Sequence, residues 1–430
     1  MRRVVIVGGG FAGADLARRL QRSLPAGWEA RLYSRENHFV FTPLLPEVVG
    51  ASINPLHVVW PLREMAPGVT CQTVEVLDLD LDQREIVYAG PAGETLRDSY
   101  DRLVLCCGLA ANLDIVPGML EHGWALKTMG DAFALRNHVI QQLEAAEAEP
   151  DEARRREFLS FAVVGGGFTG VEVAGALRDV LSESAGYYKR FDVDDIRVSV
   201  LDGAPRILGP LPEALSAYAT RQLEASGVEI RSGVGCAVVR ADGVELAGGD
   251  FLSAGTVIGS VGNTVQPLLT RAGLEIERGR LVVQADMRVA GREGVWALGD
   301  CAAVPNSYDG TISPTLGQFA SRQAKQLAQN LVADISGRPT APFRYHARGM
   351  FASIGHGRAV GNPFGLRVTG FAAYLMWRAV YLSKMPSIAR QLQIAFDWLW
   401  DVFFRRDIVE LSTLRSPRAA VPDAHRADSD

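Results

Sequence analysis

The chain has 430 residues, of which 48% are hydrophobic and 22% charged, and its formal net charge is −5. This length exceeds what one hydrophobic core accommodates and predicts roughly three domains. The acidic balance argues against a general nucleic-acid-binding protein, and five scattered cysteines without a CxxC pair suggest neither a disulfide framework nor a zinc site.

The first predicted strand begins at Val4, which leaves no room for a signal peptide, and free thiols fit a reducing cytosol. It runs into a G-x-G-x-x-G loop made by Gly8, Gly10 and Gly13, and a helix follows. In such a loop the first glycine permits a tight turn, the second lets the backbone approach a pyrophosphate, and the third lets the helix pack on the strand. A lone loop is weak evidence, because a glycine-rich turn has the same pattern.

The same unit returns in the middle of the chain, where Gly165, Gly167 and Gly170 again follow a β-branched run and precede a helix. RRVVIVGGGFAGADLARRL is repeated as LSFAVVGGGFTGVEVAGAL. Two copies in the same strand–loop–helix context predict two doubly wound α/β domains, each with a dinucleotide site at a helix N-terminus.

An acidic residue at the end of the second strand of such a unit usually holds the adenosine ribose. In the second copy RVSVLDG places Asp202 there, which favours NADH over NADPH because a carboxylate repels a 2′-phosphate. A solvated strand-end acid is the alternative, and Arg206 nearby keeps a phosphate contact open. The first copy has Ser34 at this place, followed by Arg35 and Glu36, so its ribose contact stays open.

Other elements follow from local pattern and composition. We expect strands over 69–81, 85–89 and 101–107, a linker at AAEAEPDEARRRE, an insertion at SESAGYYKRFDVDD and a helix over 318–332. Residues 344–396 carry seven Arg or Lys and no Asp or Glu, and two apolar helices are predicted at about 370–382 and 387–404. No segment reads as a transmembrane helix, and the end of the chain, 412–430, reads as a disordered polar tail.

Several longer motifs carry a resemblance to a known family. They are NHFVFTPLLPEV, GGGFTGVEVAGAL, the GDCA sequence, PTLGQFASRQAKQLAQNL and the closing GFAAYLMW…FDWLWDVFFRRDIVEL. With them the chain resembles the type II NADH:quinone oxidoreductases, single-subunit flavoenzymes of the two-dinucleotide-fold class related to glutathione reductase. The resemblance extends from the first glycine loop to about residue 411.

The resemblance implies an α/β fold with two Rossmann-like dinucleotide-binding domains and a C-terminal amphipathic helical region. The first copy then binds FAD in a domain made of 1–120 and 266–345, and the second binds NADH in an inserted domain, 121–265. Residues 346–411 would serve membrane association and dimerisation.

Expected cofactor contacts come from the same resemblance. Asp300 in GVWALGDCA would contact the ribityl chain of FAD, with an N-cap of a following helix as its alternative role. Pro43, Leu44 and Leu45 would lie against the isoalloxazine ring, unless they are ordinary core. The remaining expected contacts are Phe11, Ala12, Val76, Gly108, Phe168, Thr169, Gly262, Gly299, Thr315 and Leu316.

Three side chains are expected to orient quinone or handle its protons, namely Glu172, Gln318 and Arg322. Glu172 follows the second glycine loop, where its alternative role is a carboxylate that stabilises a helix N-terminus. The family's quinone motif is roughly Ala-Gln-x-Ala-x-Gln and reads GQFASR at 317–322 here. Because an arginine replaces the second glutamine, the identity of the quinone is open. Arg358 matches a basic position beside the family's quinone tunnel or is surface charge.

The predicted reaction is hydride transfer from NADH to FAD and then transfer of two electrons to a membrane quinone, with no nucleophile and no metal. We expect a homodimer on the cytoplasmic face of the cell membrane, attached by the C-terminal helices, which are otherwise core or dimer-interface helices. A sulfide:quinone oxidoreductase is the nearest alternative, but Cys106, Cys107 and Cys301 suggest no partnered redox pair. An NADH-sensing flavoprotein without turnover is the alternative from another class.

Overall fold

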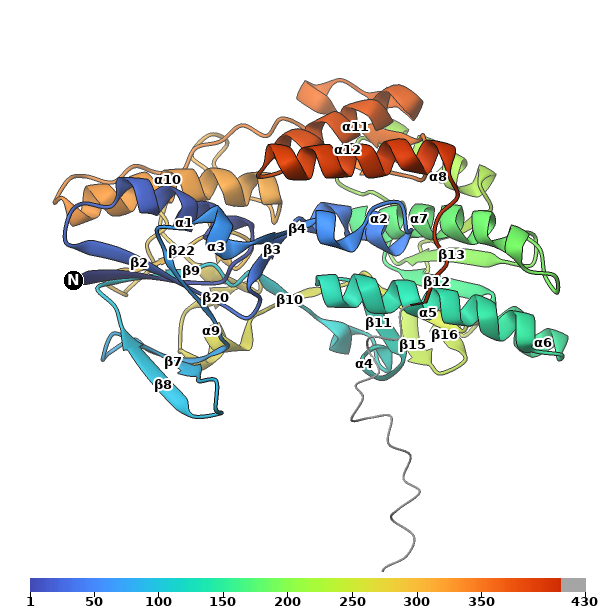
Figure 1. The fold of residues 1–430 in the computed structure, drawn as a ribbon, viewed down its shortest axis with the longest axis horizontal. Helices are drawn as coiled ribbons and strands as arrows, with labels where there is room; N and C mark the ends of the chain where they lie inside the picture. Colours follow the sequence, from blue (N-terminus) through green and yellow to red (C-terminus); the bar gives the residue numbers. More distant parts are fainter. Residues whose placement is uncertain (411–430) are drawn as a thin grey trace, which may run out of the picture.

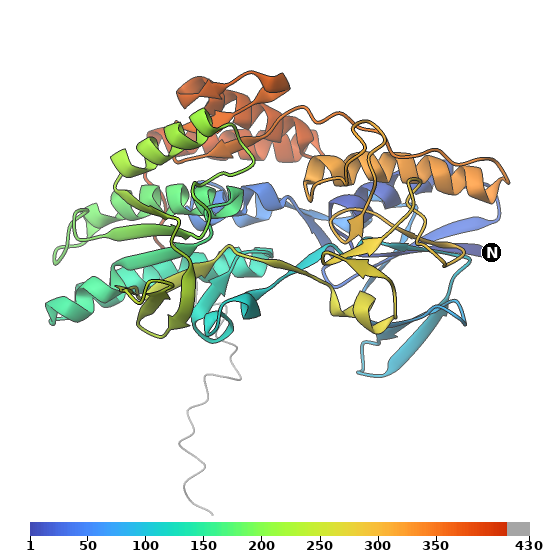
Figure 2. The ribbon, with the colours of Figure 1, turned by 180° about the vertical axis from the view of Figure 1, so that it is seen from behind.

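The computed structural model describes residues 1–410 and contains two five-stranded parallel sheets that lie side by side (Figures 1 and 2). The tail expected at 412–430 lies outside the described residues. The first sheet has the order β22-β9-β1-β2-β5, with β22 (Val295–Ala297), β9 (Arg102–Leu105), β1 (Arg2–Val7), β2 (Trp28–Ser34) and β5 (Thr70–Thr73). Because both faces of a parallel sheet are covered, the buried part of its central strand is a continuous apolar run, VVIV at 4–7.

The second sheet repeats this arrangement with the order β11-β18-β12-β13-β14. Its strands are β11 (Gly123–Ala125), β18 (Thr256–Gly259), β12 (Ser160–Val164), β13 (Arg197–Asp202) and β14 (Val228–Ser232). In each sheet the strand that enters the glycine loop, β1 or β12, is central. The predicted α/β class with two Rossmann-like units is therefore confirmed.

The long helices cover the sheets. α1 (Phe11–Ser23) and α10 (Gly317–Ile335) pack together on the upper side of the first sheet, and α5 (Met129–Ala148) and α7 (Phe168–Ser184) flank the second (Figure 1). The short α2 (Leu45–Val49) comes from the first unit but packs against α5 and α7. It thereby brings the FTPLLPEV segment to the second unit.

Smaller elements fill the edges of the two units. A further helix of 13 residues, α8 (Glu213–Ala225), packs against β14 of the second sheet. Short helices are α3 (Leu62–Met65), α4 (Met119–His122), α6 (Glu152–Phe158) and α9 (Pro267–Arg271), and the 3-10 turns are η1 (Thr42–Leu44), η2 (Pro55–His57), η3 (Leu113–Ile115), η4 (Ala185–Tyr187) and η5 (Pro363–Gly365). Short sheets are β3 (His38–Val40) with β4 (Val59–Pro61); β6 (Val76–Asp80), β7 (Glu85–Ala89) and β8 (Thr95–Ser99); β10 (Leu109–Ala111) with β19 (Asn263–Val265); β15 (Cys236–Arg240), β16 (Gly243–Leu246) and β17 (Phe251–Ser253); β20 (Ile276–Glu277), β21 (Arg280–Val282) and β23 (Ala302–Ala303); and β24 (Phe351–Ser353), β25 (Ala359–Gly361) and β26 (Val368–Thr369). β10 and β19 pair where the chain passes between the units.

Two local predictions are wrong. The strand expected over 69–81 is broken into β5 and β6, which belong to different sheets. The expected linker AAEAEPDEARRRE is the end of α5 and most of α6, because Asp151 caps α6 by accepting from the Arg154 N–H at 2.9 Å. Part of the expected insertion, residues 182–184, simply lengthens α7.

Two helices close the described chain, as predicted. α11 (Gly370–Lys384) and α12 (Ile388–Phe403) pack together above the junction of the two units (Figure 1). Ser387 caps α12 by accepting from the Arg390 N–H at 3.2 Å. Within residues 1–410 no helix combines the length and the apolar character that crossing a membrane requires.

Candidate active site

The two glycine loops have the same geometry. Gly8 and Gly165 have φ values of 109° and 112°, which L side chains rarely adopt. A Cβ on Gly13 would lie 1.9 Å from the carbonyl oxygen of Gly8, and a Cβ on Gly170 would lie 1.8 Å from that of Gly165. Only glycine permits this approach of helix to strand, so the sequence repeat is also a structural repeat.

The middle glycines differ from these in facing open space. Gly10 and Gly167 are the N-caps of α1 and α7, and a Cβ on either would meet nothing within 4 Å. No acidic side chain lies in the first turn of either helix. The N–H groups that begin the helices, at Phe11 and Ala12 in one and Phe168 and Thr169 in the other, are thus available to a pyrophosphate. Both loops fit a dinucleotide.

Ser34 and Asp202 occupy equivalent places at the ends of β2 and β13. A Cβ on Gly9 would lie 2.6 Å from Ser34 Oγ, and a Cβ on Gly166 would lie 2.6 Å from Asp202 Oδ2. Asp202 accepts hydrogen bonds from the N–H groups of Gly166 and Ala204, each at 2.9 Å. The Asp202 carboxylate therefore fixes the backbone of the glycine loop by hydrogen bonds, in addition to any contact with a ribose.

The Arg206 side chain is hydrogen-bonded to backbone carbonyls of its own loop. Its guanidinium donates to the carbonyl oxygens of Leu211 at 2.9 Å and Gly209 at 2.6 Å. These contacts weaken the case for Arg206 as a partner of a 2′-phosphate. In the first unit Arg35 and Glu36 are exposed beside Ser34 and make no hydrogen bond within residues 1–410.

Replacing Asp202 should separate its two roles. Asp202→Ala is expected to weaken NADH binding by about 1.5–3 kcal/mol, the range for a hydrogen bond to a charged group, and to reduce discrimination against NADPH. Asp202→Ser, which copies Ser34, should keep an acceptor for the loop and lose less thermal stability. Dissociation constants for both nucleotides and the Tm of each variant measure this. An Asp202→Ala enzyme with unchanged cofactor preference contradicts the ribose assignment.

The flavin half of the site collects at the ends of β9 and β22 and at the start of α10. Leu316 is the N-cap of α10, and a Cβ on Gly317 would approach the Phe11 ring to 3.3 Å. Gly108 follows β9 and Gly262 precedes β19, both with positive φ, so they turn the chain at the junction of the units. Thr315 is exposed beside this helix start.

Asp300 follows β22 and Gly299. No helix begins after it, since β23 follows, so both the expected helix and the alternative N-cap role are wrong. Its carboxylate accepts no hydrogen bond from the described residues 1–410. Burial raises the pKa of Asp300, and the nearby charges of Lys127 and Arg280 oppose that rise. An unpartnered acceptor between two cations fits a hydroxylated cofactor chain.

Of the residues expected against the isoalloxazine ring, Pro43 lines a cavity, whereas Leu44 and Leu45 are buried in the core. Pro43 in η1 lines a small cavity together with Glu172 and Trp377. Leu44 and Leu45 are 0% and 2% exposed, so ordinary core remains an open role for them. Val76 begins β6, two residues after Val74, whose N–H donates to the Ser34 carbonyl at 2.9 Å.

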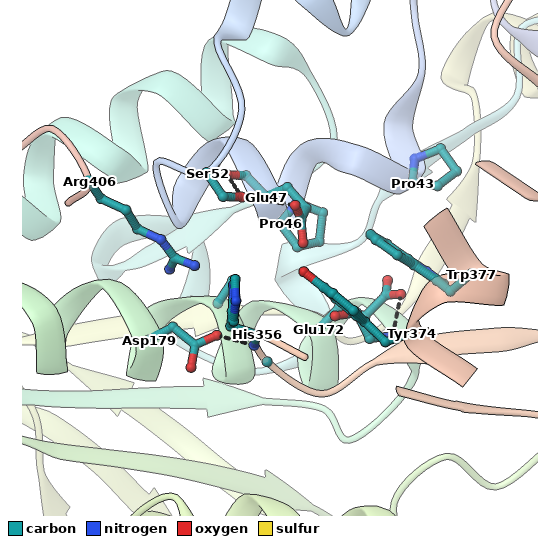
Figure 3. A pocket seen from close by; sticks show the side chains of 13 residues that line it. Pro43, Pro46, Glu47, Ser52, Glu172, Asp179, His356, Tyr374, Trp377 and Arg406 are labelled. Atoms are coloured by element: carbon teal, nitrogen blue, oxygen red, sulfur yellow. Dashed lines mark hydrogen bonds between the residues drawn. The ribbon is translucent and has the colours of Figure 1, made fainter. Parts of the chain in front are cut away.

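Glu172 lies deeper in α7 than the sequence suggested. It is the fifth residue of α7 and not in the first turn, so the alternative role at the helix N-terminus loses its basis. Its side chain is buried, and Oε1 accepts from the Ser353 N–H at 3.1 Å (Figure 3). Burial raises the pKa of Glu172 to about 8, with a further contribution from Glu47. The carboxyl is therefore mostly protonated at neutral pH.

Gln318 and Arg322 lie on α10 and meet Tyr345 rather than Glu172. Gln318 accepts from the Tyr345 hydroxyl at 3.2 Å and donates to the Gly349 carbonyl at 3.2 Å. The Arg322 guanidinium lies 5.7 Å from the centre of the Tyr345 ring.

Helix α11 connects the surroundings of Glu172 with those of Arg322. Its Trp377 lines the Glu172 cavity, and burial and the charge of Arg322 lower the pKa of Lys384 at the C-terminal end of α11. The C-terminal segment therefore lies beside both sets of residues that the sequence analysis expected to act on the quinone. Arg358 forms an ion pair with Asp179, with 3.6 Å between a guanidinium nitrogen and Oδ1, so its charge has a structural partner.

Three of the cysteines lie near one another at the ends of β9 and β22. The Cys301 thiol donates to the carbonyl oxygens of Leu298 at 3.3 Å and Leu105 at 3.5 Å. Interaction with the Cys301 thiol, together with burial, raises the pKa of the Cys107 thiol well above its ordinary value. The expectation that no partnered redox pair is present stays a prediction. All five cysteines are free thiols.

Comparison with known proteins agrees with this geometry. Residues 2–324 match the model of the family described as pyridine nucleotide-disulphide oxidoreductase, and residues 347–407 match that of the NDH2 C-terminal domain. The chain is 30% identical over 409 residues to demethylphylloquinone reductase NdbB of Synechocystis sp., covering 92% of this chain and 95% of that protein. It is 29% identical over 415 residues to the type II NADH:quinone oxidoreductase Ndh of Mycobacterium tuberculosis, covering 92% and 87%. A solved structure of NDH2 from Plasmodium falciparum in complex with NADH superposes with a TM-score of 0.88 at 17% identity, over 95% of this chain and 99% of that one.

Proposed function

The chain belongs to the pyridine nucleotide-disulphide oxidoreductases, in the branch of the type II NADH:quinone oxidoreductases, and on this basis we propose how its residues carry electrons from NADH through FAD to a quinone. The observation that carries the proposal is the pair of open glycine loops, one in each unit, together with the buried Glu172 on the helix that follows the second loop. FAD, once bound, supplies the redox chemistry, accepting hydride from NADH and passing two electrons on.

The chain's own residues bind and orient. The loop of Gly8, Gly10 and Gly13 would hold the FAD pyrophosphate, and Asp300 would accept from the ribityl chain. The loop of Gly165, Gly167 and Gly170 would hold NADH, with Asp202 at its ribose. Such fixed positioning of two reactants accounts for a large share of catalysis without any nucleophile.

Glu172 would supply or relay a proton when the quinone takes up electrons. A carboxyl with a pKa of about 8 is protonated at neutral pH and is close enough to the operating pH to act as a general acid. Gln318 and Arg322 would orient the quinone from the other side of α11. Tyr345 already holds the amide of Gln318, so we assign Gln318 a positioning role.

The C-terminal helices would attach the enzyme to the cytoplasmic face of the membrane. α12 exposes an apolar stripe at helical spacing, comprising Ile388, Leu392, Phe396, Leu399, Trp400 and Phe403, while Ile394 and Trp398 are buried. α11 adds Phe371, Leu375 and Met376. A core role is inconsistent with this exposure. A homodimer contact is a second use of the same face.

Anaerobic mixing tests the function. NADH is expected to bleach the flavin absorbance of the holoenzyme, and a soluble quinone added afterwards should restore it. Bleaching without reoxidation would favour an NADH sensor, and bleaching by sulfide alone would favour a sulfide:quinone oxidoreductase. Either result contradicts the proposal.

A further inference from the structure

A basic groove lies between α1 and α10, and none of the residues that line it is assigned to catalysis. It is a concavity of about 710 Å³ lined by five basic residues, namely Arg18, Arg19, Arg22, Lys325 and Arg338, together with Ser23, Ala328, Gln329, Val332, Ala333 and Pro339. We propose that this basic groove binds the phosphate-bearing headgroups of anionic phospholipids and so orients the enzyme on its membrane. The proposal rests on the membrane association proposed above.

The charge of the basic groove is local rather than a property of the whole molecule. The protein has a formal net charge of −5, so an average surface would be acidic. The acids of the two helices are already engaged, because Asp15 pairs with Arg18 and Arg19, and Asp334 pairs with Arg102 and Arg288.

Three cations of the basic groove are left without an acidic partner within residues 1–410. Arg22, Lys325 and Arg338 are exposed and form no ion pair in this part of the chain. Arg22 lies one turn beyond Arg18 on α1, and Lys325 lies one turn before Gln329 on α10, so the two helices present facing polar rows. A ligand with several negatively charged oxygens would compensate these charges.

The position of the basic groove selects the lipid surface as its occupant. Both views show α1 and α10 on the same upper side of the molecule as α11 and α12, whose exposed faces are apolar (Figures 1 and 2). Arg322, three residues before Lys325 on α10, is close enough to Lys384 on α11 to lower its pKa. Positive charge therefore continues from the basic groove to the end of the apolar helix pair. Basic residues beside an apolar surface suit an anionic leaflet.

The test is co-sedimentation of holoenzyme with vesicles of phosphatidylcholine alone and of equimolar phosphatidylcholine and phosphatidylglycerol. The groove variant carries Arg22→Gln, Lys325→Gln and Arg338→Gln, and leaves out Arg322 because of its assigned catalytic role. The wild type should bind the mixed vesicles more tightly, and the groove variant should lose at least about tenfold of that affinity. Binding to phosphatidylcholine alone and turnover with a soluble quinone should be unchanged.

A matched control removes three arginines from elements on the lower side in Figure 1, with Arg84→Gln in the β6–β7 turn, Arg154→Gln in α6 and Arg240→Gln in β15. It has the same net charge as the groove variant and should bind mixed vesicles like the wild type. An equal loss in the control would overturn the proposal, because net charge alone would then explain binding.

Three other outcomes would also overturn the proposal. Equal wild-type affinity for the two vesicles would overturn the basic groove and leave membrane association standing, whereas no binding to either would overturn both. Inorganic phosphate, added without vesicles, should not raise the Tm. If it raises the Tm of the wild type but not of the groove variant, and vesicle binding is the same in both, the occupant is a soluble anion and the lipid assignment is wrong.

Discussion

Gly170→Ala is expected to yield a yellow protein that NADH no longer bleaches. The new Cβ would lie 1.8 Å from the carbonyl oxygen of Gly165, which is backbone and cannot rotate away. The start of α7 must therefore move off β12, and the N–H groups that would hold the NADH pyrophosphate move with it. FAD content should persist, because the flavin loop belongs to the other sheet.

The mirror substitution should have the opposite signature. Gly13→Ala places a Cβ 1.9 Å from the carbonyl oxygen of Gly8, so this variant should be purified with little or no flavin. Flavin content from absorbance and NADH bleaching under anaerobic conditions measure the pair.

Gly10→Ala and Gly167→Ala are the matched controls. A Cβ at either place meets no protein atom within 4 Å, so both proteins should keep the Tm of the wild type, whereas Gly13→Ala and Gly170→Ala should lower it. Cofactor affinity should fall in the controls too, because the new Cβ lies where a pyrophosphate approaches. If Gly170→Ala bleaches like the wild type, the second loop is not the NADH site. If the two alanine variants of one loop have the same Tm, the steric contact with the strand is not the cause.

The parts of the fold that could be predicted are those that depend on the order of neighbouring residues in the sequence. Both glycine loops, the two terminal helices and the helix of the quinone motif follow from spacings of a few residues, and Ser34 and Asp202 are equivalent because the repeat itself aligns them. The expected linker failed for a local reason too. Its charged composition resembles a loop, but Asp151 is placed to cap a helix.

The rest of the site depends on contacts between distant parts of the chain. Glu172 and Ser353 are 181 residues apart, and the Cys301 thiol reaches the Leu105 carbonyl only because β9 and β22 are neighbours in one sheet. No local pattern reports that Tyr345 would hold the amide of Gln318, or that Trp377 would line the cavity of Glu172. The sequence therefore predicts which residues are candidates for the site, and the tertiary fold decides which of these candidates lie together.

Glu172→Gln is expected to leave flavin bleaching by NADH intact and to slow reoxidation by quinone by roughly 10²-fold, the lower end for loss of a general acid. In the wild type the reoxidation rate should fall as the pH rises through about 8, where Glu172 ionises, and in the variant it should be low and independent of pH in that range. Stopped-flow measurement of each half-reaction between pH 6 and about 9.5 separates these steps.

Stability should change in the same window. The folded pKa of Glu172 is raised from 4.5 to about 8, so the native state holds a proton that the unfolded chain has lost between these values. The stabilisation is complete below pH 4.5 and decreases toward pH 8 by at most about 1.4 kcal/mol per pH unit. Glutamine cannot ionise, so the variant should lack this slope in denaturant unfolding at a series of pH values.

Glu47→Gln distinguishes a proton donor from a merely buried polar group. Glu47 accepts from Ser52 Oγ at 2.9 Å and Trp398 Nε1 at 3.0 Å, and its charge helps to raise the pKa of Glu172. Glutamine keeps an acceptor oxygen but removes the charge, so the fall in reoxidation rate should move to lower pH while the rate below it stays near that of the wild type. If Glu172→Gln reoxidises as fast as the wild type, or if Glu47→Gln leaves the pH profile where it was, the protonated carboxyl of Glu172 is not the group that the quinone step uses.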